Sequence, residues 1–372
     1  MRFLIITHVF HKPKNGQWFA YAPYVREMNL WLKHVDEVEI VAPKTEESIS
    51  EIDIAYQHNN ITLTKIPSIA LTNISSGLKS LIALPLIILR LYQACRRADH
   101  IHLRCPGNIG LLGCLVQVLF PNKVKTAKYA GNWDPNAKQP LSYRIQKKLL
   151  SNTSWTKNMT AIVYGDWQNQ TKNIKPFFTA TFKNEDRLVV KPRVYSKNLN
   201  FVFVGSLVAG KRPLLAIQIV EALKNKGLSV TLDLYGDGIL KPKLKQYTED
   251  NNLSNIVRLH GNQTSQTVKI ALKNAHFTIL ASKSEGWPKA LAEAMFFGVI
   301  PVATSISCVP DMLDYGKRGI LIEPTVKDAV SKIEAHLKLK TDLKAMSKLA
   351  SNWSQNYTLD VFEEEIKKLI VA

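Results

Sequence analysis

Residues 282–298 read Ser282-Lys-Ser-Glu285-Gly-Trp-Pro288-Lys-Ala-Leu-Ala-Glu293-Ala-Met-Phe-Phe-Gly298 and decide the fold. A run typical of a buried strand, residues 275–281, precedes them, and Pro288 stands where a helix would begin. A strand, a tight loop and a helix N-terminus together suit anion binding, because the first backbone N–H groups of a helix have no partner within it. The stretch therefore predicts a phosphate-binding loop.

Two glutamates lie on either side of the expected helix start. Glu285 lies in the loop, and Glu293 lies about one and a half turns into the helix. The neighbours of Glu293 are apolar, so its carboxylate is costly to bury unless a partner compensates it. Two carboxylates beside a free helix N-terminus would suit a ligand with hydroxyls and phosphates, such as a sugar nucleotide. The alternative is that Glu293 is a structural carboxylate with a partner in the protein and that Glu285 is a solvated loop residue.

Strand-like and helix-like segments alternate outward from this stretch. Five short strand-like runs divide the first half, and the pattern restarts at residue 199 after a mixed stretch. Such alternation predicts parallel sheets covered by helices on both faces, and 372 residues are long for a single core. We expect an α/β fold with two doubly wound, Rossmann-like domains, a boundary near residue 195, and an interdomain ligand cleft at the carboxyl ends of the strands.

A second candidate phosphate loop follows the strand-like run at 199–204. It reads Gly205-Ser206-Leu-Val-Ala-Gly210-Lys211-Arg212-Pro213, with Pro213 at the start of the next expected helix. Glycines let the backbone approach a ligand closely, and Lys211 would bring a positive charge to it. Such loops are common in α/β proteins, so this one is equally compatible with a plain turn.

The charge of the chain is strongly positive and uneven. The formal net charge is +19, and residues 101–200 hold 16 Lys and Arg against 4 Asp and Glu, a net charge of +12. A basic half needs an anionic partner or is merely a solvated face. No nucleic-acid-binding motif is present, so we expect no nucleic acid. An anionic membrane surface with a lipid-linked phosphate fits better, and purely electrostatic attachment to it should reverse at high salt.

Cysteine usage and hydropathy bear on localisation. The four cysteines show neither a metal-binding spacing nor a disulfide framework, which favours a reducing cytoplasm. The longest apolar run, residues 81–89, contains Pro85 and is too short to span a bilayer. We interpret it as a buried or interfacial helix, and we expect a cytoplasmic protein attached peripherally, if at all, to the inner face of the cell membrane.

The motifs of the second half resemble, in order and spacing, the retaining glycosyltransferases of family 4 (glycosyl transferases group 1), which have the GT-B fold. The resemblance covers about residues 199–324 and is looser in the first half, where it rests on the first strand, the Gly16 loop and residues 21–27. The segment 353–357 resembles the terminal element that crosses back onto the first domain. The implied limits are an acceptor-side domain at 1–195, a nucleotide-sugar domain at 196–352 and a returning helix at 353–372. The motifs that carry the resemblance are Gly205 with Lys211, residues 235–238, 259–261, 284–288, 293–295, 298–301 and 309–311, Gly316 and Gly319.

The resemblance implies a role for each matching residue. Glu285 would contact the donor sugar, Glu293 the ribose hydroxyls, and Lys211 the donor diphosphate. Two positions depart from the family: Ser206 stands where an arginine is usual, with Arg212 and Arg318 as possible substitutes, and Asn132 or Asp134 stands in place of an acceptor-side histidine. The predicted catalytic residues are Glu285, Lys211 and Asp134. The predicted donor-binding residues are Gly16, Gly205, Ser206, Lys211, Arg212, Gly286, Trp287, Pro288 and Glu293.

The implied reaction transfers a sugar, with retention, from a UDP- or GDP-linked donor to a glycan or lipid-linked oligosaccharide in cell-surface polysaccharide synthesis. Breaking the glycosyl–phosphate bond leaves negative charge on the diphosphate, which Lys211 and the helix N-terminus would stabilise. No Asp-x-Asp metal signature is present, so we expect no metal site, no metal requirement and no cofactor besides the donor substrate.

Two other functions remain open at this point. A sugar-nucleotide epimerase shares the GT-B architecture, but it would need its own acid and base carboxylates and no acceptor. A basic membrane- or nucleic-acid-binding protein with a defunct cleft would show salt-sensitive binding to nucleic acid and no binding of nucleoside diphosphates.

Overall fold

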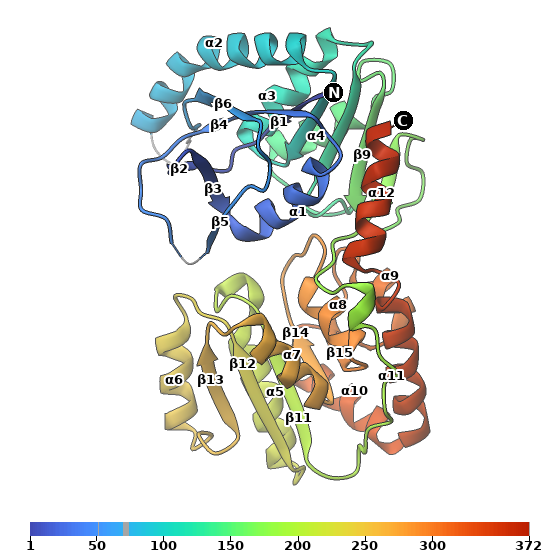
Figure 1. Ribbon diagram of the computed structural model, residues 1–372. Helices are drawn as coiled ribbons and strands as arrows, with labels where there is room; N and C mark the ends of the chain where they lie inside the picture. Colours follow the sequence, from blue (N-terminus) through green and yellow to red (C-terminus); the bar gives the residue numbers. More distant parts are fainter. Residues whose placement is uncertain (51, 70–73, 372) are drawn as a thin grey trace. The chain divides into compact units, whose positions relative to one another are not determined.

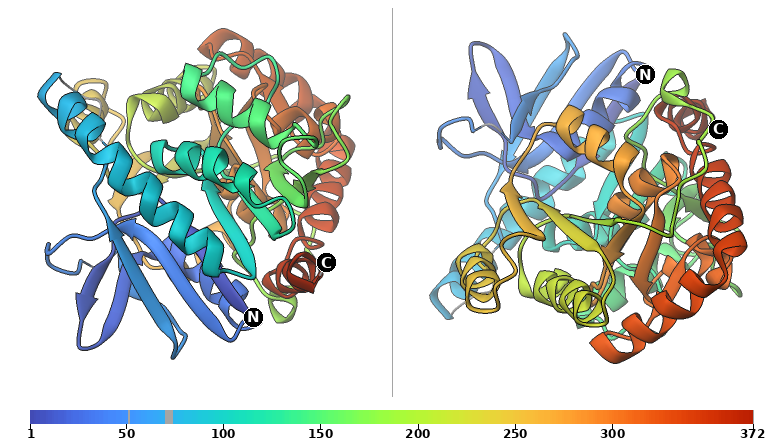
Figure 2. Two further views of the ribbon diagram at one scale, coloured as in Figure 1. Left: turned by 90° about the horizontal axis from the view of Figure 1, so that it is seen from above. Right: turned by 90° about the horizontal axis from the view of Figure 1, so that it is seen from below.

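The computed structural model describes residues 1–50, 52–69 and 74–371 (Figure 1). The chain divides into two compact units. The first comprises Met1–Phe177 and Phe362–Ala372, and the second comprises Phe178–Val361. Each unit has its own large sheet with helices on both sides (Figures 1 and 2).

Among its described residues, the first unit has a seven-stranded parallel sheet in the order β10-β9-β8-β7-β1-β4-β6. Side chains from β1 and β7 pack with the long helix α2 in one apolar core. The strands are β1 Arg2–Ile6, β4 Glu37–Pro43, β6 Ile61–Ile66, β7 His100–Cys105, β8 Val124–Tyr129, β9 Met159–Tyr164 and β10 Ile174–Phe177. The helices are α1 Ala22–Leu32, α2 Ile74–Arg97, α3 Asn108–Val116, the 3-10 turn η1 Gln117–Leu119 and α4 Leu141–Leu150.

Gly16 lies at the tip of a β-hairpin rather than in an irregular loop. The strands β2 Lys12–Lys14 and β3 Gln17–Tyr21 pair antiparallel, and β5 Asp53–Ala55 completes a small sheet. Asn15 and Gly16 both have positive φ, +49° and +76°, which is the backbone of a two-residue turn that matches strand twist. Glycine suits this position because it adopts positive φ without steric cost.

The second unit has, among the residues described, a six-stranded parallel sheet in the order β13-β12-β11-β14-β15-β16. Successive residues of β11 face opposite sides: Phe201 and Phe203 join the core beneath α5, and Val202 joins the core beneath α8. The strands are β11 Leu199–Val204, β12 Val230–Tyr235, β13 Val257–Gly261, β14 Phe277–Leu280, β15 Ile300–Thr304 and β16 Ile320–Ile322. The helices are η2 Asn184–Asp186, η3 Ala209–Lys211, α5 Pro213–Asn225, α6 Lys241–Asp250, α7 Ser265–Asn274, α8 Lys289–Phe296, α9 Val309–Met312, η4 Asp314–Gly316, α10 Val326–Lys338 and α11 Lys340–Ser354. Helix α12 Leu359–Val371 begins in the second unit, but its residues from Phe362 onward belong to the first.

The prediction of two doubly wound α/β units is confirmed, but the limits at 195 and 352 are corrected to 177 and 361. Residues 178–198 belong to the second unit because their side chains anchor there. The ring of Phe182 lies 4.8 Å from that of Phe296, and Arg193 donates to the carbonyl of Gly298 over 2.8 Å. This segment has little regular secondary structure, so no periodicity in the sequence marks the core that it joins.

The apolar run at 81–89 is part of a longer helix than its sequence suggested. Helix α2 continues through Pro85 and has 24 residues. By length and composition, Gly77–Arg97 could cross a membrane, and it is the one such helix within the described residues. The expectation that this region is too short to span is therefore wrong.

Candidate functional site

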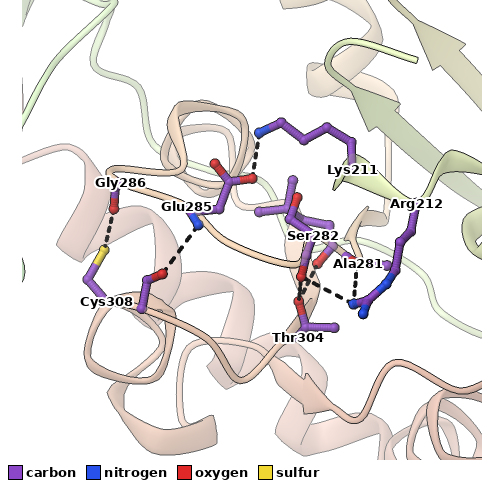
Figure 3. Close-up of polar contacts among 10 residues, drawn as sticks. Lys211, Arg212, Ala281, Ser282, Glu285, Gly286, Thr304 and Cys308 are labelled. Atoms are coloured by element: carbon purple, nitrogen blue, oxygen red, sulfur yellow. Dashed lines mark hydrogen bonds and ion pairs between the residues drawn. The ribbon is translucent and has the colours of Figure 1, made fainter. Parts of the chain in front are cut away.

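An ion pair between Lys211 and Glu285 forms the centre of the candidate site (Figure 3). The Nζ atom of Lys211 lies 2.5 Å from Oε1 of Glu285. Lys211 ends η3, just beyond β11, and Glu285 lies in the loop between β14 and α8. The side chain of Glu285 is 9% exposed, whereas that of Lys211 is 31% exposed. The carboxylate is therefore held by a cation that still has surface available for a ligand.

Two residues from the loop before α9, Ser307 and Cys308, hold the loop that carries Glu285 in place. Figure 3 shows the contact of Cys308 with Gly286. The N–H of Glu285 donates to Oγ of Ser307 over 3.2 Å, and the thiol of Cys308 donates to the carbonyl of Gly286 over 3.0 Å. Burial raises the pKa of the Cys308 thiol to about 12, so the thiol keeps its proton at neutral pH. The main chain on both sides of Glu285 is thus held independently of its side chain, and the carboxylate is preorganised. Sequence reasoning missed both residues.

The guanidinium of Arg212 is bonded to the main chain just after β14 and is not left free for a ligand. Its Nη1 atom donates to the carbonyls of Ala281 and Ser282 over 3.1 and 3.4 Å (Figure 3). The other proposed substitute, Arg318, donates to the carbonyl of Met312 and lies 5.2 Å from the ring of Trp353. Both guanidinium groups therefore have partners in the protein, and Ser206 itself is exposed.

The glycine loops after β11, β12 and β13 come together at the carboxyl ends of these strands. The N–H of Gly205 donates to the carbonyl of Tyr235, and that of Gly236 donates to the carbonyl of Gly261, over 2.9 and 2.8 Å. A Cβ atom on Gly236 would lie 2.0 Å from the carbonyl oxygen of Gly205, so only glycine allows this approach. The loop of Gly205 leads directly to Lys211.

The N-terminus of α8 follows the Glu285 loop. Pro288, expected as the first helical residue, is the N-cap, so the helix begins one residue later at Lys289, and no side chain caps this end. Trp287 fixes the path of the chain into α8, because its ring stacks on that of Trp353 at 6.0 Å and meets that of Tyr357 at 5.6 Å. Gly286, Trp287 and Pro288 thus set the direction of a helix end that favours anions.

Glu293 has a different partner from Glu285. Its Oε1 atom accepts a hydrogen bond of 2.6 Å from Oγ1 of Thr181, and burial raises the pKa of its carboxyl above the ordinary value. In this structure Glu293 therefore matches the alternative interpretation, in which it is a structural carboxylate with a partner in the protein. A donor hydroxyl would have to replace that of Thr181. Glu293 lines a narrow pocket with residues 179–182, Lys289, Ala292, Phe296, Ser354 and Tyr357.

Two predicted site residues, Gly16 and Asp134, belong to the first unit. Gly16 forms the hairpin turn described above. Asp134 lies after β8, where its Oδ1 atom accepts the N–H of Asn136 over 2.8 Å and its own N–H donates to Oδ1 of Asn132. Lys147 donates to the carbonyl of Asp134 over 3.0 Å. These contacts describe an ordered turn, and the roles of both residues remain predictions.

With this geometry in hand, the chain can be compared with known proteins. The family model described as "Glycosyl transferases group 1" matches residues 184–356, a range that contains Lys211, Glu285 and Glu293. Sucrose-phosphate synthase from Thermosynechococcus elongatus aligns over 100% of this chain and 98% of its own, with a TM-score of 0.67 and 14% identity. The chain has the GT-B fold.

A second GT-B structure of similar likeness is Anabaena HepE in complex with UDP and glucose, with a TM-score of 0.67, 13% identity, and coverage of 100% of this chain and 99% of that one. Among curated proteins, the putative colanic acid biosynthesis glycosyltransferase WcaL of Escherichia coli (strain K12) is 27% identical over 183 residues. That match covers 47% of this chain and 45% of WcaL, so the chain spans less than half of this relative's length. The family model and this relative are both described as glycosyltransferases.

Within residues 1–50, 52–69 and 74–371, no three or more His, Cys, Asp or Glu side chains are grouped so as to hold a metal ion.

Proposed function

We propose that this protein is a retaining glycosyltransferase of family 4. It moves a sugar from a UDP- or GDP-linked donor to a glycan or lipid-linked oligosaccharide during the synthesis of a cell-surface polysaccharide. The observation that carries the proposal is the Lys211–Glu285 ion pair between two predicted phosphate-binding elements, the Gly205 loop and the N-terminus of α8. Two similar proteins support it: WcaL is named for colanic acid biosynthesis, and the HepE structure contains UDP.

The ion pair suits a site that must accept a diphosphate. In the free protein the two charges neutralise each other. A bound diphosphate would compete for the ammonium of Lys211, which is partly exposed, and would free Glu285 to accept hydroxyls of the donor sugar. As the glycosyl–phosphate bond breaks, Lys211 would stabilise the charge on the leaving diphosphate. Retention would follow from attack on the same face, with a diphosphate oxygen taking the proton of the acceptor hydroxyl.

A thermal-shift screen with UDP, GDP, ADP and their sugars tests this proposal. A ligand present far above its dissociation constant should raise the free energy of unfolding by roughly 2–4 kcal/mol. We expect this for UDP or GDP and their sugars. Lack of stabilisation by any nucleoside diphosphate, together with salt-sensitive binding to nucleic acid, would favour a basic binding protein instead.

We expect catalysis to be independent of divalent metal. The physical reason is that Lys211 and the N-terminus of α8 supply the positive charge that a metal ion would otherwise provide. Initial rates of transfer in excess EDTA should equal those in added magnesium or manganese. An enzyme that EDTA inactivates and manganese restores would show that this cationic site is insufficient.

We expect the ionised carboxylate of Glu293 to lower the stability of the folded protein and to strengthen donor binding. Its folded pKa is raised by burial above the ordinary value of 4.5, so the ionised carboxylate disfavours the folded state as pH rises through that folded pKa. Glu293→Gln removes this loss and keeps an acceptor for Thr181. We expect its melting temperature to match or exceed the wild-type value at about pH 7.5, with the advantage lost near pH 4.

In the same variant, nucleotide affinity should fall about tenfold, because one charge-assisted hydrogen bond to the ribose is weakened. Isothermal titration calorimetry with UDP and GDP measures it. Wild-type affinity in the folded variant would leave Glu293 with a structural role only.

We also propose that the enzyme works in the cytoplasm, attached peripherally to the inner face of the cell membrane. The net charge of +12 over residues 101–200 supports attachment to anionic lipid. All four cysteines are buried as free thiols, which is compatible with a reducing compartment.

A further inference from the structure

Helix α2 has an apolar side that no other part of the described structure covers. One side of the helix packs into the core of the first unit through Ile87, Leu91, Ala94 and Cys95. The opposite side, here called the outer face, exposes large apolar side chains, from 40% at Tyr92 to 73% at Ile82. Large contiguous apolar patches are rare on soluble monomers and mark interaction surfaces. The outer face consists of Leu78, Leu81, Ile82, Leu86, Ile88, Leu89 and Tyr92.

The apolar surface continues beyond the helix. The ring of Tyr92 lies 5.2 Å from that of Phe120, which directly follows η1. Leu119, the last residue of η1, is 64% exposed. Figure 2 (left) shows α2 lying lengthwise along the outside of the first unit. The outer face is therefore a strip along a helix about 36 Å long rather than an isolated spot.

Positive charge borders this strip. Lys79, Arg90 and Arg97 are spaced by eleven and seven residues, about three and two helical turns, so they lie along one edge of α2. Lys65, Lys79 and Arg96 are exposed, whereas Arg97 pairs with Glu39 at 2.6 Å. The one acidic residue between residues 54 and 133 is Asp99. Asp99 accepts the N–H of Arg2 over 2.7 Å. The surroundings of the outer face thus complement an anionic surface.

We propose that the outer face of α2 docks on an anionic lipid bilayer, with the helix lying in the plane of the interface. This docking rests on the proposed function, in which the acceptor is held at the membrane. The apolar side chains would enter the boundary between headgroups and acyl chains, and the exposed Lys79 would contact the headgroups. Arg97 pairs with Glu39, and Arg90 donates to the carbonyl of Lys65.

The packing of α2 distinguishes this arrangement from two others. Spanning the bilayer would remove Ile87, Leu91 and Ala94 from the core of the first unit, so the helix cannot span while the unit is folded. A second copy of the chain would bring the same positive charge to the surface, whereas an anionic bilayer brings the opposite charge.

The exposed leucines change the salt dependence expected from charge alone. Electrostatic attraction is screened as the Debye length falls from about 10 Å at 0.1 M salt to about 3 Å at 1 M, but the burial of apolar surface is not. Attachment to anionic vesicles should therefore weaken at high salt without disappearing. From charge alone, the sequence predicted that attachment would reverse completely at high salt.

Vesicle sedimentation with matched variants tests the docking. The test variant is Leu81→Gln/Ile82→Gln/Leu89→Gln, which keeps good helix formers on α2. The control is Val189→Gln/Ile239→Gln/Ile270→Gln, whose side chains are 93%, 83% and 52% exposed in the second unit. On phosphatidylglycerol vesicles we expect the test variant to bind at least tenfold more weakly, because three apolar side chains that would enter the bilayer are replaced by polar ones. The control should bind as the wild type does, and neutral phosphatidylcholine vesicles should bind poorly.

A site-specific probe reports insertion directly. The native cysteines are buried, so Ile82→Cys offers an accessible thiol for a polarity-sensitive fluorophore. Its emission should shift to the blue on addition of anionic vesicles, while the same label at Ile239→Cys should not change. Wild-type protein that ignores anionic vesicles, or a test variant that binds them fully, would overturn the docking. A stable dimer that the test variant abolishes would also overturn it, because a second copy would then cover the outer face.

Donor binding separates this result from the proposed function. In the absence of vesicles, the test variant should show the wild-type melting shift with nucleoside diphosphates. Loss of vesicle binding with an intact shift confirms the surface. If the wild-type protein binds vesicles but nucleoside diphosphates do not change its melting temperature, the proposed function is contradicted and the proposed docking of α2 is not.

Discussion

Glu285→Gln should lower turnover at least a hundredfold while the protein stays folded. The substitution keeps the shape of the side chain and removes its charge. Glu285 is preorganised by main-chain bonds to Ser307 and Cys308, which the substitution does not touch. Removing one preorganised group that acts in a transition state typically costs about 10²–10³ in rate. The effect should therefore appear in kcat rather than only in KM.

Initial-rate kinetics with the donor identified by thermal shift measure this effect, and a melting curve checks the fold. Glu323→Gln is a suitable control, because Glu323 is an exposed glutamate in the loop after β16 of the same unit. Wild-type turnover in folded Glu285→Gln would remove this residue from the mechanism.

Lys211→Met should reduce kcat/KM by roughly 10²–10³ and should also weaken binding of the diphosphate. Methionine keeps most of the apolar stem and removes the ammonium that faces Glu285. The variant loses the cation that opposes the charge of the leaving group. In addition, the Glu285 carboxylate, 9% exposed, then repels the diphosphate without compensation.

A double-mutant cycle separates the two parts of the Lys211 effect. Lys211→Met alone should lower the melting temperature, because it leaves a mostly buried carboxylate unpaired, and Lys211→Met/Glu285→Gln should recover that loss without recovering turnover. Lys226→Met is the matched control, since Lys226 pairs with Glu334 at a distance of 2.6 Å elsewhere in the second unit. Retained activity in Lys211→Met would move the diphosphate site to another cation.

The sequence predicts the central pair and the two-unit fold well, for identifiable reasons. Strands, glycine turns and helix starts follow local rules, so the alternation around residues 199–324 predicts a doubly wound sheet. In parallel sheets the loops after neighbouring strands meet at one edge, which brings Lys211 to Glu285 although they are 74 residues apart.

Other parts of the site have no local signal. Ser307 and Cys308 act through a hydroxyl, a thiol and backbone atoms, and nothing in their spacing distinguishes them from ordinary loop residues. The partner of Glu293 lies in a segment without periodic structure, so Thr181 could not be anticipated. Helix α2 is apolar on nearly all sides, a pattern that also fits complete burial, and only the structure shows that one side packs.

The division of the chain has a consequence for how the protein is made. The first unit is discontinuous: it needs Phe362–Ala372 in addition to Met1–Phe177. Within it, the ring of Phe362 lies 5.3 Å from that of Phe177 and 5.0 Å from the buried ammonium of Lys128. During synthesis on the ribosome, the N-terminal unit therefore stays incomplete until Phe362–Ala372 have emerged, and by then the whole second unit has been translated. A fragment cut at residue 177 would keep the rings of Tyr164 and Phe177 over Lys128 but would lose that of Phe362.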